Sequence, residues 1–235
     1  MTKPVELRLP EIEKSDAMTT QDYVYRRLHN AIMVGAIPPA TSLTFRGLAA
    51  SLDLSPTPVR EAIRRLSSEH AVEVQGNRRL VIPEMTAGRF EELVQLRIAL
   101  EVHAAERSLP YVSDIVIEKM KALDDEMDQM VKDKSFDRLT CLNYEFHSIL
   151  YTLNPDQAVM PLIQSVWLQL GPFQRQVVND LESFYFVDRH KEILTALRSR
   201  DLAALVVGIE SDIRDGMARE GRRLLLKQPR NSAAS

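Results

Sequence analysis

The sequence contains almost no cysteine and no long apolar run. Its 235 residues include one cysteine, Cys141, so no disulfide can form within the chain. A single thiolate is also too little for a zinc ribbon, so a metal ion would have to be held by His, Asp, Glu or Asn. No apolar stretch approaches the about 18 residues that a membrane helix requires, and no signal-like leader opens the chain. These features predict a cytoplasmic protein without a membrane partner.

Acidic residues slightly outnumber basic ones, but the two signs are unevenly distributed. The formal net charge is −3. Divided at Pro83, where the apolar pattern changes, the chain carries net +2 before this point and net −5 after it. Arginines cluster in the first part, at Arg60, Arg64, Arg65, Arg78 and Arg79. Because clustered arginines suit a phosphate backbone, this part is a candidate for contact with nucleic acid.

The pattern up to Pro83 predicts three helices and a hairpin. Residues 1–18 have no sustained period and are expected to form a flexible arm. Apolar residues at helical spacing predict one helix from Thr20 to a stop at Gly35, a second capped by Thr44 and a third capped by Ser55. Alternating segments at 71–75 and 80–82 predict a two-stranded hairpin. This is the order of a winged helix-turn-helix domain, here residues 19–83.

Residues 84–230 read as helix almost throughout. Breaks are expected at Pro110, Asn154-Pro155, Pro161, Gly171-Pro172 and Asp180. About six helices should result, the last running from Leu202 to Leu226. The predicted fold class is therefore mainly α: a winged helix-turn-helix with three helices and a β-hairpin wing, followed by an all-α antiparallel bundle of about six helices.

The stretch from Ser55 to Leu66, SPTPVREAIRRL, closely resembles the recognition-helix signature S-x-T-P-V-R-E-A-L-x-x-L of the GntR family of bacterial repressors. Later segments, Arg97-x-x-Leu100-Glu101, Asn143-x-x-Phe146-His147 and the run from His190 to Leu197, resemble the FadR-like (FCD, VanR-type) C-terminal domain that accompanies this head. The likeness spans roughly residues 20–226. It implies a DNA-binding transcriptional regulator, expected to be a repressor, rather than an enzyme.

Three positions depart from the family pattern. Ala40 stands where a glycine usually follows the proline, Pro56 stands where many members have arginine, and Arg79 occupies the usual wing-glycine position. These departures affect the expected wing geometry and operator sequence. They leave the expected fold unchanged.

The recognition helix supplies most of the candidate DNA-binding residues. Ser55 and Thr57 can cap the helix and, by resemblance, also bind a phosphate. Arg60 is the candidate for reading guanine O6 and N7; a surface ion pair with Glu61 or Glu69 is its alternative role. The resemblance implies further groove or phosphate contacts, at Arg46, Arg64, Arg78 and Arg79.

Two arginines of that helix compete for the same role. Arg64 and Arg65 point about 100° apart around a helix, and Arg64 shares the face of Arg60. We therefore expect Arg64 to contact DNA. One head alone would bury too little surface, so a homodimer on a pseudo-palindromic double-stranded operator is predicted.

Four residues of the helical domain form a candidate metal site. Asn143 and His147 are four residues apart and share a helix face. The resemblance adds His190 and Asp212; here Asn replaces the usual Asp at 143, and Asp replaces the last His at 212. This set suits Zn, with Ni, Mn or Fe possible. The alternative is a metal-free polar cavity in which both histidines hydrogen-bond Asp212.

Arg97 is the candidate effector-binding residue. With Glu101 at i+4 it could form a helix-surface ion pair. The family's matching arginine often faces the cavity, where it would grip the carboxylate of a small organic acid.

Three functions remain open: an effector-responsive regulator, a direct metal sensor, and a metal-dependent hydrolase or oxygenase using His147, His190 and Asp212. The enzyme is disfavoured because the sequence has no HExxH motif, nucleophile elbow or phosphate loop.

Overall fold

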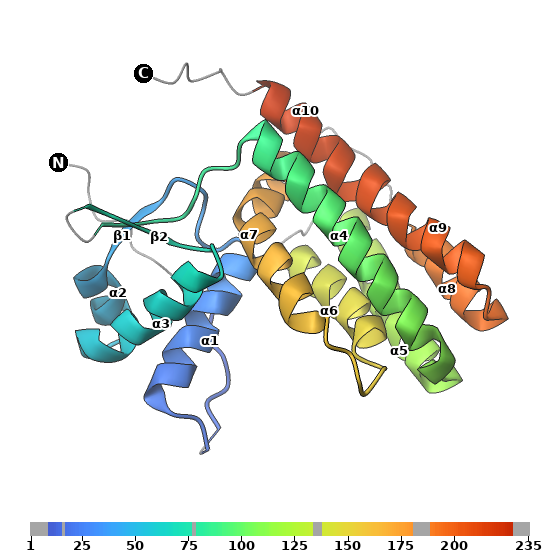
Figure 1. The fold of residues 1–235 in the computed structure, drawn as a ribbon, viewed down its shortest axis with the longest axis horizontal. Helices are drawn as coiled ribbons and strands as arrows, with labels where there is room; N and C mark the ends of the chain where they lie inside the picture. Colours follow the sequence, from blue (N-terminus) through green and yellow to red (C-terminus); the bar gives the residue numbers. More distant parts are fainter. Residues whose placement is uncertain (1–8, 16, 77–78, 134–137, 181–188, 228–235) are drawn as a thin grey trace. The chain divides into compact units, whose positions relative to one another are not determined.

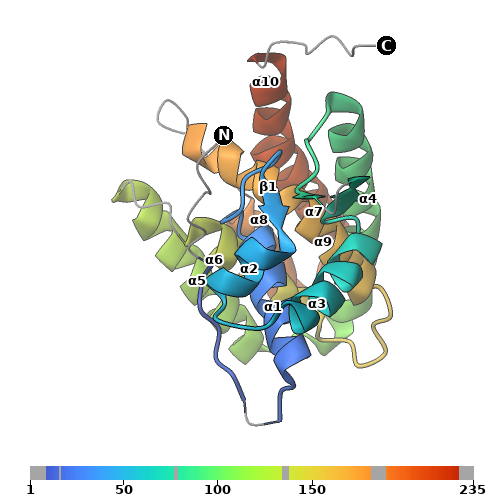
Figure 2. The same cartoon turned by 90° about the vertical axis from the view of Figure 1, so that its left-hand side faces the viewer.

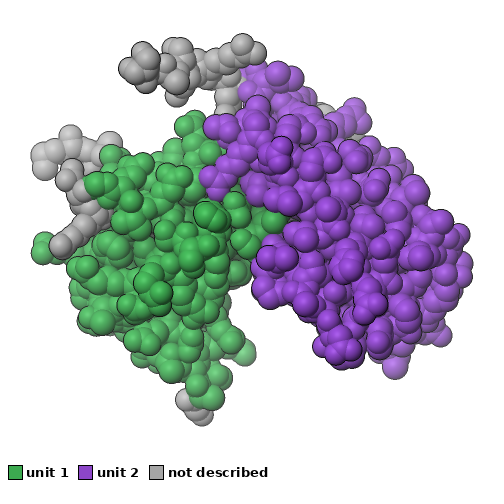
Figure 3. Space-filling model, viewed as in Figure 1, with its two compact units in different colours: residues 1–85, 165–176 green, residues 86–164, 177–235 purple. Residues whose placement is uncertain are grey.

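The structure, a computed structural model, describes residues 9–15, 17–76, 79–133, 138–180 and 189–227. By their contacts the residues form two units, coloured separately in Figure 3. The first contains residues 1–85 and 165–176, and the second contains residues 86–164 and 177–235. The grouping of residues 165–176 with the first unit is not evident from the sequence.

The first unit contains the predicted helices of a winged helix-turn-helix. They are α1 (Thr20–Met33), α2 (Phe45–Ser51) and α3 (Pro56–Ser68). Helix α3 packs on both α1 and α2, as two views of the fold show (Figures 1 and 2). The buried side chains of α3 are Val59, Ala62, Ile63 and Leu66, which follow the helical period. One face of α3 therefore serves the core and the opposite face is left exposed.

Gly35 ends α1 in the way the sequence predicts. Its φ of +69° lies in the left-handed region that favours glycine. The Gly35 amide donates to the Ile32 carbonyl and the Ala36 amide to the Ala31 carbonyl, at 2.9 and 2.8 Å. This pair of bonds satisfies carbonyls that the last turn of a helix leaves without partners.

The wing is a three-stranded antiparallel sheet rather than a hairpin alone. Strands β2 (Glu73–Gln75) and β3 (Arg79–Val81) form the predicted hairpin, and β1 (Ser42–Thr44) adds to the other edge of β3 in the order β1-β3-β2. Strand β1 is not predictable from the sequence, because three residues are too few to show an alternating pattern. Leu43 pairs with Leu80, and both are buried, so this pair anchors the sheet to the core.

Part of the expected flexible arm is packed against the first unit. Leu9 is buried, and the Arg27 guanidinium donates to the carbonyls of Leu9 and Pro10, each at 3.3 Å. The expectation of a free arm is therefore wrong for these two residues. Burial of one apolar side chain and two hydrogen bonds to a guanidinium account for the difference.

The second unit is all-helical in its described residues. Its elements are α4 (Ala87–Ser108), the short 3₁₀ helix η2 (Leu109–Tyr111), α5 (Asp114–Lys132), α6 (Leu139–Tyr151), the two ends of α7 (Met160–Asn179), α8 (His190–Ser199), α9 (Leu202–Ile213), the π-helical segment η4 (Arg214–Ala218) and α10 (Arg219–Lys227). Helix α4 packs on α6 and α9, α5 on α6 and α8, and α8 on α9. This packing brings one face each of α5, α6, α8 and α9 together.

Two predicted features of the helical region are wrong in detail. Gly171-Pro172 does not end a helix, since α7 continues through these two residues. A Cβ on Gly171 would lie 2.2 Å from the Met33 carbonyl oxygen, so this glycine permits close packing against α1. The last predicted helix is interrupted at η4, where Gly216 has a non-helical ψ of −106°.

Candidate nucleic-acid interface and metal centre

The exposed face of α3 carries the predicted DNA-reading side chains. Thr57, Arg60 and Arg64 are all exposed and recur at intervals of three and four. The Arg60 guanidinium lies over the Phe45 ring of α2, 5.1 Å from its centroid, which holds it beside the turn between the two helices. The alternative partners of Arg60 bind elsewhere: Glu61 pairs with Arg64, and Glu69 accepts from the Tyr25 hydroxyl.

Ser55 occupies the N-cap position of α3, but its side chain forms no capping hydrogen bond. A capping oxygen normally accepts from the second or third amide of the helix. Here the third helical residue is Pro58, which has no N–H. The predicted side-chain cap is therefore wrong. The exposed hydroxyl of Ser55 does not stabilise the start of α3.

The structure distinguishes Arg64 from Arg65. Arg65 turns towards α1, where its guanidinium lies 3.6 Å from the Tyr25 ring centroid and 3.1 Å from Asp22 Oδ1. The Arg64 side chain is 75% exposed and pairs with Glu61 on its own helix. Arg64 thus remains on the outward face, as the helical spacing predicts.

The other basic candidates lie on α2 and the wing. Arg46 is exposed in the first turn of α2. Arg79 is exposed on β3, and its Nε donates to Ser42 Oγ at 2.5 Å. Arg78 lies outside the described residues. The first unit therefore presents basic side chains from its recognition helix, from α2 and from its sheet.

The second unit brings the four predicted metal ligands together at one place, where His147, His190 and Asp212 are buried and Asn143 is half-buried. Asn143 and His147 come from α6, His190 is the first residue of α8, and Asp212 lies near the end of α9. Both histidines are 1% exposed and Asp212 is 8% exposed. One ligand atom each from His147, His190 and Asp212 lies within 4.8 Å of the others.

The separations between the ligand atoms are close to those of ligands that share one ion. His147 Nε2 lies 3.1 Å from Asp212 Oδ2, and His190 Nε2 lies 3.8 Å from Asp212 Oδ1. His190 Nε2 is also 3.1 Å from Asn143 Oδ1. Ligands bound to one ion at about 2.0–2.2 Å stand roughly 3 to 3.5 Å apart, so two of these separations lie in that range and the His190–Asp212 separation is slightly longer; with a small shift of one side chain the residues fit a metal. The same contacts also fit the metal-free cavity that the sequence leaves open.

The opposite nitrogen of each imidazole contacts a residue that the sequence analysis missed. Tyr151 lies four residues after His147 on α6, and its hydroxyl is 3.2 Å from His147 Nδ1. Asp124 of α5 is 3.1 Å from His190 Nδ1 and is 2% exposed. Asp124 shares the buried face of α5 with Ile117, Met120 and Met127. The position of the Asp124 carboxylate among apolar residues at helical spacing could have indicated from the sequence that it is a buried polar group.

Electrostatics keep the two buried aspartates ionised. Burial alone would raise the pKa of Asp212, but the nearby His190 and the hydrogen bond with His147 hold it well below its ordinary value. The pKa of Asp124 is likewise lowered by His190 and Lys191 against the effect of burial. The backbone amide of Arg189 donates to Asp212 Oδ1 at 3.0 Å. A buried carboxylate thus faces two imidazoles, an arrangement that favours a cation.

Arg97 forms an ion pair with Glu101 on α4, but this pair is buried rather than on the helix surface. Its Nε and Nη2 donate to the two oxygens of Glu101 at 2.6 and 3.3 Å, and the two side chains are 2% and 0% exposed. Burial would lower the pKa of Arg97, but the Glu101 carboxylate raises it above its ordinary value. Two guanidinium nitrogens of Arg97, the candidate effector-binding residue, are thus engaged by Glu101.

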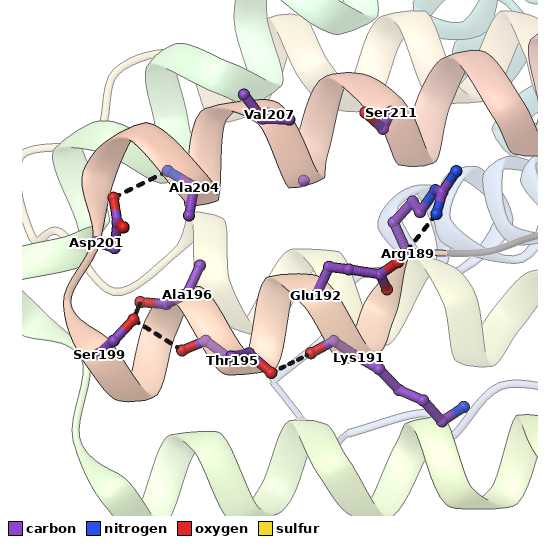
Figure 4. A pocket seen from close by; sticks show the side chains of 11 residues that line it. Arg189, Lys191, Glu192, Thr195, Ala196, Ser199, Asp201, Ala204, Val207 and Ser211 are labelled. Carbon is purple, nitrogen blue, oxygen red and sulfur yellow. Dashed lines mark hydrogen bonds and ion pairs between the residues drawn. The ribbon is translucent and has the colours of Figure 1, made fainter.

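A hollow of about 720 Å³ lies elsewhere in this unit, between α8 and α9 (Figure 4). Ala196, Ala204 and Val207 give it an apolar side, and charged residues such as Arg189 and Glu192 stand at one end. Its lining includes neither the two histidines nor Asp212. The hollow is therefore separate from the candidate metal centre.

A winged helix-turn-helix with an exposed basic recognition helix, joined to an all-helical unit, defines the class of DNA-binding transcriptional regulators. Comparison with protein families places the particular lineage. Residues 20–82 match the bacterial regulatory proteins of the gntR family, and residues 92–214 match the FCD domain. The chain belongs to the GntR family, in its FadR-like group with an FCD domain, and is a transcriptional regulator rather than an enzyme.

Individual relatives agree with this assignment. The chain is 24% identical to the HTH-type transcriptional regulator McbR of Escherichia coli K12 over 74% of its length and 80% of the relative. It is 23% identical to the gluconate operon transcriptional repressor of Bacillus subtilis, over 80% of this chain and 79% of that one.

Solved structures share the fold. Escherichia coli McbR/YncC superposes with a TM-score of 0.77 at 20% identity, covering 88% of this chain and 99% of that chain. A GntR regulator of Rhodococcus sp. RHA1 gives 0.71 at 23% identity, covering 89% and 99%. Among the described residues, no helix combines the length and apolar composition needed to cross a membrane.

Proposed function

We propose that this regulator is a homodimeric repressor that binds a pseudo-palindromic operator, and that a small carboxylate bound at a metal ion in the helical unit controls its DNA affinity. The name of one relative, the gluconate operon repressor, supports repression. The exposed face of α3, with Arg60 and Arg64, supports reading of the major groove, and a dimer would supply the interface area that one head lacks.

One observation carries the regulatory half of the proposal: three buried donors and one half-buried donor lie close together. Two imidazoles, the Asp212 carboxylate and the Asn143 amide oxygen come from α6, α8 and α9. Such a set suits Zn, and also Ni, Mn or Fe, and leaves positions that water or an effector carboxylate can fill. An effector of this kind alters repression only if it binds one DNA-affinity state better than the other.

A second candidate, direct metal sensing, is favoured by the contacts of Arg97. Its guanidinium edge is already engaged by Glu101, so capture of an effector carboxylate there would require breaking a buried ion pair. In this version the metal ion alone changes the affinity for the operator, and no organic acid is needed.

The test measures fluorescence anisotropy of DNA from the regulator's own promoter region with metal-free protein, zinc-loaded protein, and zinc-loaded protein with a panel of carboxylic acids. Effector control predicts that one acid changes the affinity of the zinc-loaded protein. Direct sensing predicts that zinc alone does so. A protein that ignores this DNA at low ionic strength would contradict the DNA-binding proposal.

Two variants separate the halves of the proposal. His147→Ala should lose zinc while its metal-free form still binds DNA, and Arg60→Ala should keep zinc and lose specific DNA binding. Thermal unfolding gives a second readout, because zinc at 100 times its Kd should add about 2.7 kcal/mol to the stability of the wild type. No stabilisation of the wild type by any of the four metals would overturn the metal site.

A further inference from the structure

We propose that Tyr151 and Asp124 are positioning residues, which hold His147 and His190 in the tautomer protonated on Nδ1 and so aim both Nε2 atoms at Asp212. This inference rests on the proposed metal function and assigns a supporting role to residues outside the ligand set. In it, Arg97 anchors one of the two histidines through Glu101 instead of gripping an effector.

The first chain of contacts begins at the buried ion pair. Arg97 donates to both oxygens of Glu101, so the Glu101 carboxylate acts as a hydrogen-bond acceptor here. The Tyr151 hydroxyl lies 3.0 Å from Glu101 Oε2 and donates its single hydrogen there. Because that hydrogen is used, the hydroxyl can only accept from His147 Nδ1, 3.2 Å away. His147 Nδ1 therefore carries the proton.

The second chain is shorter and uses a different element. Asp124 Oδ1 lies 3.1 Å from His190 Nδ1, and Lys191 Nζ lies 3.7 Å from Asp124 Oδ2. An ionised carboxylate only accepts, so the proton of a neutral His190 lies on Nδ1. Carboxylates commonly hold metal-binding histidines in this way and make them more basic ligands.

Both chains have the same consequence at the centre of the site. Protonated rings would donate from Nε2 to Asp212, but once each ring is neutral and keeps its proton on Nδ1, His147 Nε2 and His190 Nε2 turn lone pairs towards the Asp212 carboxylate, at 3.1 and 3.8 Å. Acceptors facing acceptors repel one another unless a cation lies among them. The two chains of contacts use different helices, α4 and α6 for His147 and α5 for His190, so each can be removed separately by mutation.

The experiment compares Tyr151→Phe and Asp124→Asn with matched controls in the full chain. Tyr144→Phe removes a hydroxyl from the same helix, and Asp125→Asn removes a neighbouring exposed carboxylate that pairs with Lys121. Zinc affinity is measured by competition with a chelator, and the absorption of bound Co(II) reports the ligand geometry. We expect each test variant to weaken zinc binding about 10- to 100-fold and to change the Co(II) spectrum. The controls should leave both unchanged.

A metal-free readout separates this inference from the proposed function. Long-range ¹H–¹⁵N spectra of the chelator-treated protein at about pH 8, above the usual imidazole pKa, give the tautomer of each of its five histidines. His147 and His190 should be protonated on Nδ1; Tyr151→Phe should alter His147 alone, and Asp124→Asn should alter His190 alone. A variant that only destabilises the fold would lower Tm without this selectivity.

The outcomes are distinct. If the wild type binds no zinc, the proposed metal function fails, and the tautomer spectra alone decide the positioning roles. If the wild type binds zinc but the two test variants match their controls in affinity and tautomer, the positioning roles are overturned while the metal site stands.

Discussion

Among single residues, Arg60 should separate DNA reading from folding. Its guanidinium is exposed beside Phe45, so Arg60→Ala should remove the proposed base contact and little packing. We expect operator affinity to fall by about 1–3 kcal/mol, roughly 5- to 150-fold, with Tm nearly unchanged. Arg65→Ala is the matched control, because it removes the same charge from the same helix. Arg65 contacts Asp22 and Tyr25, so this variant should lower Tm more than Arg60→Ala does and should reduce operator affinity less. Equal losses of affinity in both variants would contradict this assignment.

Ala40 shows how a departure from a family pattern becomes a physical prediction. Its φ of +59° lies in the left-handed region, which costs a residue with a Cβ about 1–2 kcal/mol. Replacing Ala40 by glycine removes this cost, but glycine also has greater conformational freedom in the unfolded chain, which cancels part of the stabilisation. Ala40→Gly should therefore stabilise the first unit by up to about 1 kcal/mol. Chemical denaturation measures the effect. Ala50→Gly, at an exposed position in α2, should instead destabilise by about 0.5–1 kcal/mol.

Asn143 is the weakest donor of the proposed metal site. Its amide oxygen lies 3.1 Å from His190 Nε2, where a carboxylate would add a negative charge to the ligand set. Asn143→Asp should tighten zinc binding by at least about tenfold, equivalent to about 1.4 kcal/mol. Asn30→Asp, made in the first unit, should not change it. Unchanged affinity in Asn143→Asp would remove Asn143 from the ligand set.

Among the helices, the starts of α2 and α3 differ in a measurable way. Thr44 accepts the Gly47 amide at 3.0 Å, whereas Ser55 caps nothing with its side chain. Thr44→Ala should therefore cost about 1 kcal/mol of stability, and Ser55→Ala much less. If the Ser55 hydroxyl binds a phosphate, Ser55→Ala should weaken DNA binding and leave Tm nearly unchanged. A large stability loss in Ser55→Ala would show that its hydroxyl supports the helix after all.

The sequence predicted the elements whose signals are local. The Thr44 cap, the apolar period of α3 and the Gly35 stop depend on residues close in sequence, so they could be predicted directly, whereas the Ser55 side-chain cap was predicted and does not form. Strand β1 and the continuation of α7 through Gly171 could not, because each depends on a partner distant in sequence: β3 for the strand and the end of α1 for the glycine. Tertiary packing overrides local propensity in such places.

For the whole molecule, the four candidate ligand positions could be predicted from the family resemblance. The residues that contact the two histidines could be identified only from the structure. Tyr151 continues the spacing of Asn143 and His147 on α6, and Arg97 and Glu101 continue the buried stripe of α4. A sequence shows that such residues share a face but not what faces them. That Glu101 meets Tyr151, and Asp124 meets His190, depends on how α4, α5, α6 and α8 pack.

The assembled regulator makes a prediction about DNA spacing. If two heads bind one operator through a two-fold axis, the half-sites must lie about 10–10.5 base pairs apart or a multiple of this, because both recognition helices must meet the same side of the duplex. Inserting about five base pairs at the centre of the operator turns one half-site to the opposite side and should abolish tight binding. Inserting about ten restores the side and should recover more affinity than the shorter insertion. Light scattering should give twice the 26.7 kDa of the chain; a monomer that binds both altered operators equally would exclude paired heads.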